Sequence, residues 1–148
     1  MDEAQGRLVF QFFNEIGILE QLSRAVLEGE LPDGLLASHF GVLNHLIRVR
    51  DGQTPLVLAR AFQVPKTTMT HTLAGLEKRG LVEMRPNPED GRSKCVWITE
   101  AGRDLRDRTI AQIVPRFQPM LAAFPAERIA ALVPELAALR AVMDRARD

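Results

Sequence analysis

The 148-residue chain has little of what builds disulfide frameworks, metal clusters or membrane spans. Its one cysteine, Cys95, excludes an internal disulfide and any zinc site made of several cysteines. The longest unbroken apolar run is five residues, too short for a transmembrane helix. The acidic start Met1-Asp2-Glu3 has no apolar segment after it, which argues against a signal peptide. We therefore expect a cytoplasmic protein without a membrane partner, a metal or a cofactor.

The chain is also poor in aromatic residues, at 5%, and it lacks tyrosine. Hydrophobic residues make up 46% and charged residues 26%, a balance typical of one globular domain. Nineteen basic and nineteen acidic side chains cancel, which argues against a generally polycationic protein. The charge is uneven, however: residues 1–52 carry net −4, residues 53–99 net +3 and residues 100–148 net +1. The middle third is therefore the place for a negatively charged partner, although differences this small also fit chance variation.

Long helices are predicted at both ends of the chain. Apolar residues recur every three or four positions over about residues 5–28, which is the period of one helix face. The C-terminal third is also helical in pattern, with Pro115 and Pro119 expected to interrupt it and Pro134 to bend the last helix. These apolar faces are larger than a small central core can cover, which predicts burial against a second copy of the chain.

Two short helices follow one another in the centre of the sequence, after a helix predicted from about Leu36. Thr54-Pro55 starts the first, because Thr is a good N-cap and Pro fits the first helical position. Val64-Pro65 starts the second, and Gly80 ends it. Two short helices separated by three or four residues predict a helix-turn-helix.

The helical period is lost after Gly80. Residues 81–85 and the alternating residues 94–99 predict two strands, and the turn-forming residues 86–93 between them predict a hairpin with a charged tip. Thr99 is the expected N-cap of another helix. The order of elements predicts a mainly α protein with a small β-hairpin wing (α+β). Its architecture is a winged helix-turn-helix with long N- and C-terminal dimerisation helices.

Several short motifs stand in order, without gaps, between about residues 36 and 102. They are Phe40-x-Val42-Leu43, Thr54-x-x-x-Leu58-Ala59, Lys66-Thr67-Thr68-Met69-Thr70, Leu76-Glu77-x-x-Gly80-Leu81-Val82, Asp90-x-Arg92 and Val96-x-Ile98-Thr99-x-x-Gly102. The set resembles the MarR family of bacterial transcription regulators. Two departures concern DNA contacts: Gly91 stands where many members have a second Arg, and His71 where Arg is common.

The resemblance implies a homodimeric regulator that binds double-stranded DNA at an imperfect palindrome. It implies a DNA-binding lobe over residues 35–102 and dimerisation arms over residues 1–34 and 103–148. It also implies a repressor relieved by a small aromatic or anionic effector held between arms and lobe. Phe13 and His39 are weak candidates for that ligand site.

The second short helix carries the expected base-reading residues at its N-terminal end, opposite the apolar residues Met69, Leu73 and Leu76. A helix-turn-helix presents this end to base edges, and free N–H groups there favour phosphate. Thr hydroxyls can bond to bases and Thr methyls can meet thymine methyls. The candidates are Lys66, Thr67, Thr68, Thr70 and His71. The alternative is an ordinary solvated helix start.

The hairpin tip supplies Arg92 and Lys94, and an Arg on a wing suits the narrow minor groove of A·T-rich DNA. By the family resemblance, Asp90 orients Arg92 through a charge-assisted hydrogen bond. The alternative is a plain polar turn with a surface ion pair worth little. Three further candidates for phosphate contacts are Gln53, Thr54 and Arg85.

Other functions find less support in the sequence. The three histidines, Cys95 and the scattered carboxylates show no spacing typical of a metal site or a nucleophile, so no enzyme is predicted. Redox sensing through Cys95 remains an alternative, because Lys94 beside it favours the thiolate. Two rival functions stay open: a winged-helix protein-interaction module without DNA binding, and a small-ligand carrier.

Overall fold

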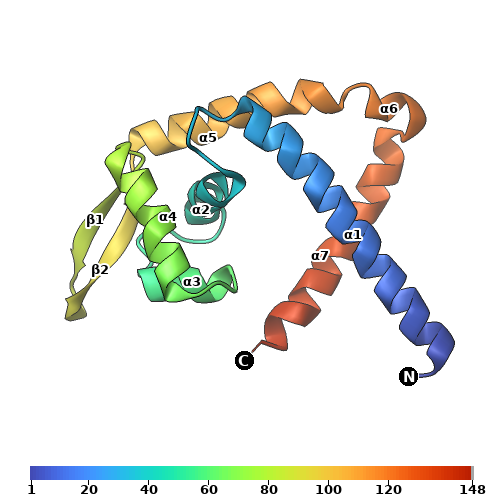
Figure 1. The fold of residues 1–148 in the computed structure, drawn as a ribbon, viewed down its shortest axis with the longest axis horizontal. Coiled ribbons are helices and arrows are strands. Elements are labelled where there is room, and N and C mark those ends of the chain that lie inside the picture. Colours follow the sequence, from blue (N-terminus) through green and yellow to red (C-terminus); the bar gives the residue numbers. More distant parts are fainter. Residues whose placement is uncertain (148) are drawn as a thin grey trace. The chain divides into compact units, whose positions relative to one another are not determined.

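The computed structural model describes residues 1–147, and the chain divides into two compact units, Met1–Ile113 and a second that begins at Val114. The first unit is mainly helical with one β-hairpin, as predicted (Figure 1). Its elements are α1 (Glu3–Glu30), α2 (Ala37–Arg48), α3 (Pro55–Ala61), α4 (Lys66–Lys78), β1 (Val82–Asn87), β2 (Asp90–Ile98) and α5 (Glu100–Ile113). The second unit contains the 3₁₀ helix η1 (Val114–Phe117), α6 (Met120–Ala123) and α7 (Ala126–Arg145). None of the helices in the described part of the chain is long and apolar enough to cross a membrane.

The helix-turn-helix consists of α3 and α4, and its local signals act as predicted. The Thr54 hydroxyl accepts a hydrogen bond from the Val57 N–H and Pro55 occupies the first turn, so α3 begins where the sequence indicates. The turn after α3 uses Gln63 at φ 54°, a left-handed conformation that is uncommon outside glycine. Gly80 takes φ 69° just beyond α4, which lets the chain leave the helix and enter β1.

The core of the first unit lies between α2, the helix-turn-helix and the hairpin. Leu43, Leu58, Leu76 and Val96 come from four different elements and have no measurable exposure. The buried residues of α4 recur at helical spacing, so one side of this helix packs inward and the other remains free.

The hairpin is longer than the sequence predicted. The strands β1 and β2 extend into residues 86–93, which leaves only Pro88 and Glu89 between them. The prediction of a broad turn was wrong, because pairing across the hairpin overrides the local turn preference of these residues. Pro86 is tolerated opposite Lys94 since β1 is an edge strand, and the register shifts just after it.

The later prolines act at helix boundaries, with one exception. Pro115 lies in the 3₁₀ helix after α5 and Pro119 is the N-cap of α6, so both interrupt the helical pattern as predicted. Pro134 lies inside α7, which continues through it. Compactness thus divides the chain after α5. The division into a DNA-binding lobe and dimerisation arms is a functional one and stays a prediction.

Candidate nucleic-acid interface

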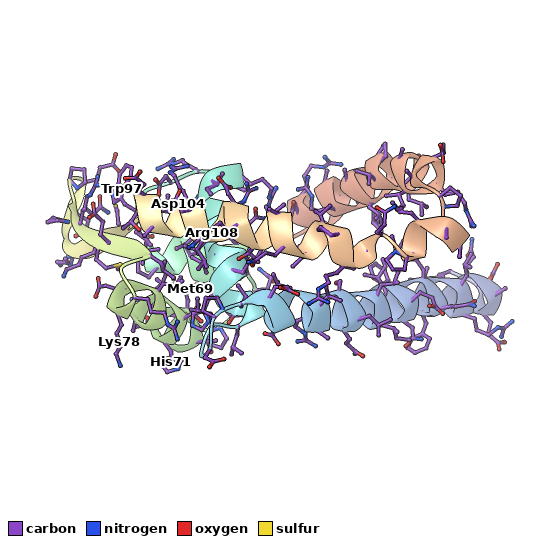
Figure 2. The ribbon with its side chains drawn as sticks, turned by 90° about the horizontal axis from the view of Figure 1, so that it is seen from above. Met69, His71, Lys78, Trp97, Asp104 and Arg108 are labelled. Atoms are coloured by element: carbon purple, nitrogen blue, oxygen red, sulfur yellow. The ribbon has the colours of Figure 1, made fainter. Side chains whose placement is uncertain are left out.

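The outer side of α4 is polar, exposed and positive at its N-terminal end. The five candidate residues there are all exposed: Lys66, Thr67, Thr68, Thr70 and His71. Met69, between them in sequence, is 2% exposed and points into the core, whereas His71 points away from the body of the unit (Figure 2). The helix therefore separates a packing side from a side that can enter a groove.

The threonines of α4 differ in what their hydroxyls already do. The Thr70 hydroxyl donates to the Lys66 carbonyl at 2.9 Å and keeps its lone pairs available as acceptors. Thr72 is buried and donates to the Thr68 carbonyl. The sequence prediction left Thr72 out of the recognition set, and its burial agrees with that choice.

The arginine of the wing, Arg92, is exposed to solvent. The Arg92 side chain is 94% exposed, and Asp90 Oδ1 accepts hydrogen bonds from the Arg92 backbone N–H at 3.0 Å and from its Nε at 3.4 Å. Ser93 and Asn87 form further hydrogen bonds across the tip. The backbone bond fixes the turn, while the weak side-chain contact leaves the guanidinium free to reach a partner. Lys94 is exposed on the same strand.

The three candidates for phosphate contacts are engaged inside the unit. Gln53 Oε1 lies 2.8 Å from His45 Nε2, and the Thr54 hydroxyl caps α3. Arg85 pairs with Glu83, and its guanidinium lies 4.9 Å from the centre of the Trp97 ring. These bonds use the acceptor oxygens of Gln53 and Thr54, so the Gln53 amide N–H groups and the Thr54 O–H could still donate to a phosphate.

The weak candidates for a ligand site do not meet within one chain. His39 lies in the first turn of α2, whose first residue, Ala37, donates its N–H to the Glu28 carboxylate at 2.7 Å. Phe13 is fifteen residues before Glu28 on α1, which is about 22 Å at 1.5 Å per residue. The two residues thus line no common pocket in a single chain. Across residues 1–147, no group of three or more His, Cys, Asp or Glu side chains is placed to hold a metal.

Sequence reasoning passed over Asp51, which the structure places at the base of the wing. Its carboxylate accepts hydrogen bonds from the backbone of Gly52 and Ile98. The only local signal was an Asp-Gly pair before a helix start, which is typical of any turn. Ile98 is 47 positions away, so this contact could not be read from the sequence.

Comparisons with known proteins agree with this geometry. The sequence profile of the MarR family matches residues 33–93. The transcriptional regulator HosA of Escherichia coli O111:H- is 32% identical over 93 residues, a match that covers 63% of this chain and 67% of HosA. The transcriptional activatory protein BadR of Rhodopseudomonas palustris is 30% identical over 105 residues, covering 70% of this chain but only 58% of BadR.

A solved structure extends the likeness to the fold. Wild-type MarR from E. coli in its apo form superimposes with a TM-score of 0.73 at 25% identity, over 85% of this chain and 94% of that one. Regulators of this family bind DNA, function as dimers and are not enzymes. On its sequence matches and its winged helix-turn-helix, the chain belongs to the MarR family of transcriptional regulators.

Proposed function

We propose that this regulator binds an imperfect DNA palindrome as a homodimer, with α4 in the major groove and the wing in the minor groove. The observation that carries the proposal is the pairing of an exposed N-terminal end of α4 with an exposed Arg92 in one compact unit. Thr70 and His71 would read base edges, and Arg92 with Lys94 would supply the positive charge of the wing. In a symmetric dimer the two copies of α4 would enter grooves about 34 Å apart.

We infer further that binding represses transcription and that a small molecule relieves it. Support for a ligand site comes from a surface cavity of about 600 Å³, a size typical of small-molecule sites. Buried leucines line it together with two arginines and two aspartates, so its charges balance: Leu35, Leu81, Leu105, Arg79, Arg108, Asp104 and Asp107. Arg79 lies directly after α4, so a ligand here would bias the position of the recognition helix.

Activation is the second candidate, and one comparison favours it. BadR, which is 30% identical to this chain, is named a transcriptional activatory protein. The same DNA contacts would serve either outcome, because the direction of regulation depends on where the palindrome lies relative to the promoter. A reporter gene placed behind the bound DNA separates the two: repression lowers expression when the regulator is present, and activation raises it.

The decisive experiment is a fluorescence-anisotropy titration of the purified protein with duplexes that tile the DNA upstream of its own gene. The titration is run at two salt concentrations. Tight binding to one palindromic tile that weakens steeply with salt is expected. Binding that is uniformly weak and insensitive to salt, on these tiles and on duplexes selected from random sequence, would contradict the proposal and favour a protein-interaction module.

The wing contact is tested by Arg92→Ala. Loss of one groove-facing cation should weaken specific binding by about tenfold and reduce the salt slope by about one. Lys78→Ala is the matched control, because it removes the same charge from the far end of α4 (Figure 2). If both variants keep the affinity and salt slope of the parent, the wing does not contact DNA.

A further inference from the structure

The base of the wing is held by one carboxylate. Asp51 Oδ1 accepts hydrogen bonds from the Gly52 N–H and the Ile98 N–H, both at 3.0 Å. Its Oδ2 lies 3.6 Å from Arg103 Nη2 on α5, and the Asp51 side chain is 22% exposed. One side chain therefore contacts its own loop, the end of β2 and the helix that follows the wing.

This carboxylate continues a short backbone ladder. The Gly52 N–H also donates to the Val96 carbonyl at 2.9 Å, and the Val96 N–H donates to the Gln53 carbonyl at 2.8 Å. Residues 52 and 53 thus pair with the outer edge of β2, and Asp51 takes the next donor on that edge. Ile98 is only 8% exposed. If the Asp51 carboxylate were removed, the Ile98 N–H would therefore be left without a hydrogen-bond partner, because water reaches it poorly.

Trp97 packs on the same contact between the loop at Asp51-Gly52 and β2. Gly52 has φ 72°, and a Cβ there would stand between 2.5 and 2.9 Å from three atoms of the Trp97 indole. The indole therefore lies directly on the Gly52 backbone, with Arg85 against its ring. Since Trp97 is the one tryptophan of the chain, its fluorescence reports on this junction without any label.

We propose that Asp51 is a positioning residue for DNA binding, whose carboxylate ties the wing to the loop that leads into the helix-turn-helix and so sets where Arg92 lies relative to α4. The inference rests on the proposed function, in which Arg92 contacts DNA. Arg92 is six residues from Ile98 along β2, about 20 Å at 3.3 Å per residue. A tilt of about 6° at the base would therefore displace the arginine by about 2 Å.

The first test is Asp51→Ala. This change removes a negative charge near DNA, which by itself favours binding, yet the loss of both backbone hydrogen bonds is expected to weaken specific binding by about tenfold. Asp51→Asn loses the same charge but keeps an acceptor oxygen, so it should restore most of the affinity. Arg103→Gln is the second control and should bind nearly as the parent, because an ion pair at 3.6 Å with a half-exposed arginine is worth little.

A double-mutant cycle shows whether Asp51 acts through the wing. In an Arg92→Ala background, Asp51→Ala should cost less than twofold, because the residue it positions is gone. Equal losses in both backgrounds would overturn the inference, since Asp51 would then act elsewhere. If Asp51→Ala does not fold, Asp51→Glu keeps the charge but moves the carboxylate by one methylene, and the same dependence on Arg92 is expected.

Trp97 provides a measurement that needs no DNA. Asp51→Ala should shift its emission to longer wavelength and raise its quenching by acrylamide, while Arg103→Gln leaves both unchanged. Parent protein that binds no duplex would overturn the proposed function and the DNA part of this inference together. An Asp51→Ala variant that binds like the parent, where Arg92→Ala is weakened, would overturn this inference alone.

Discussion

At the scale of single residues, His39 lies between the start of α2 and the helix α4. Its Nδ1 accepts a hydrogen bond from the Leu36 N–H at 2.9 Å, one of the donors that a helix start leaves unpaired. On the other side, a Cβ at Gly75 of α4 would stand 2.9 Å from His39 Nε2, so the two helices meet closely here. Burial first, then the charges of Arg79 and His71, lower the pKa of His39 below its usual 6.5. The ring therefore serves as a neutral acceptor.

This environment predicts that the protein loses stability in mild acid. The unfolded chain binds a proton at His39 near pH 6.5, whereas the folded chain binds it only at lower pH. The contribution of His39 is thus complete above about pH 6.5 and is lost as the pH falls toward its lower folded pKa. Urea unfolding between pH 8 and pH 5, at fixed protein concentration, should show this loss.

His39→Gln should flatten the pH dependence of the unfolding free energy. His71→Gln is the control and should keep most of it, because burial, the main cause of the lowered pKa, is unchanged. A pH dependence in His39→Gln as steep as in the parent would show that other groups cause it.

Residues whose partners are close in sequence were the predictable ones. The Thr54 and Thr99 caps bond to N–H groups three positions on, so a local pattern suffices to find them. Gln53 was predicted to face phosphate, yet its side chain bonds to His45 on the preceding helix. That bond depends on how α2 and the loop pack together, which the local pattern does not contain.

At the scale of elements, α4 presents Thr70 and His71 one after the other on its free side. Replacing both by Ala should reduce the preference for specific over random DNA by about tenfold or more, since base contacts carry sequence information and phosphate contacts do not. Anisotropy titrations with a specific and a scrambled duplex measure this ratio. The salt slope should change little, because contacts to bases, unlike contacts to phosphates, release few counterions.

The ratio of specific to scrambled binding distinguishes base recognition by α4 from phosphate binding by α4. Lys66→Ala should weaken both duplexes alike, because an ammonium at the helix start acts as a point charge. A double variant with unchanged discrimination would remove Thr70 and His71 from base recognition and leave α4 as a phosphate-binding helix.

The elements also show where sequence patterns stop being sufficient. The starts of α3, α4 and α5 follow caps and prolines, Gly80 follows the end of α4, and these positions were predicted closely. The wing was predicted too short, because Pro86 and Asn87 favour turns in isolation but pair across the hairpin in the fold. Residues 52 and 53 also pair with β2, but their sequence has no strand pattern. This pairing is a single bridge to Val96, far along the chain, so a local pattern does not predict it.

At the scale of the whole molecule, most of the apolar pattern of α1 is left exposed, and only its C-terminal end, at Leu27, packs against the core of the first unit. No residue of α1, whose helix is described in full, is buried, and large hydrophobic side chains are exposed along it. Leu19 and Leu22, on the predicted stripe, are each 62% exposed. A soluble monomer rarely leaves such a face open, which favours burial against a second copy. The apolar stripe was predictable from the sequence, but the surface that it packs against was not.

We therefore expect light scattering to give a mass of twice 16.5 kDa for the parent protein. Changing Leu19 and Leu22 together to Glu should shift it toward the monomer. Four leucines leave the interface of a symmetric dimer, and at about 1.5 kcal/mol each the loss is about 6 kcal/mol, before the cost of burying the new charges. Val49→Glu, at a similarly exposed apolar site after α2, should remain a dimer.

The double variant should also lose tight binding to the palindrome while keeping weak binding to a half-site, because each lobe would bind alone. A double variant that stays dimeric would exclude this stripe from the interface.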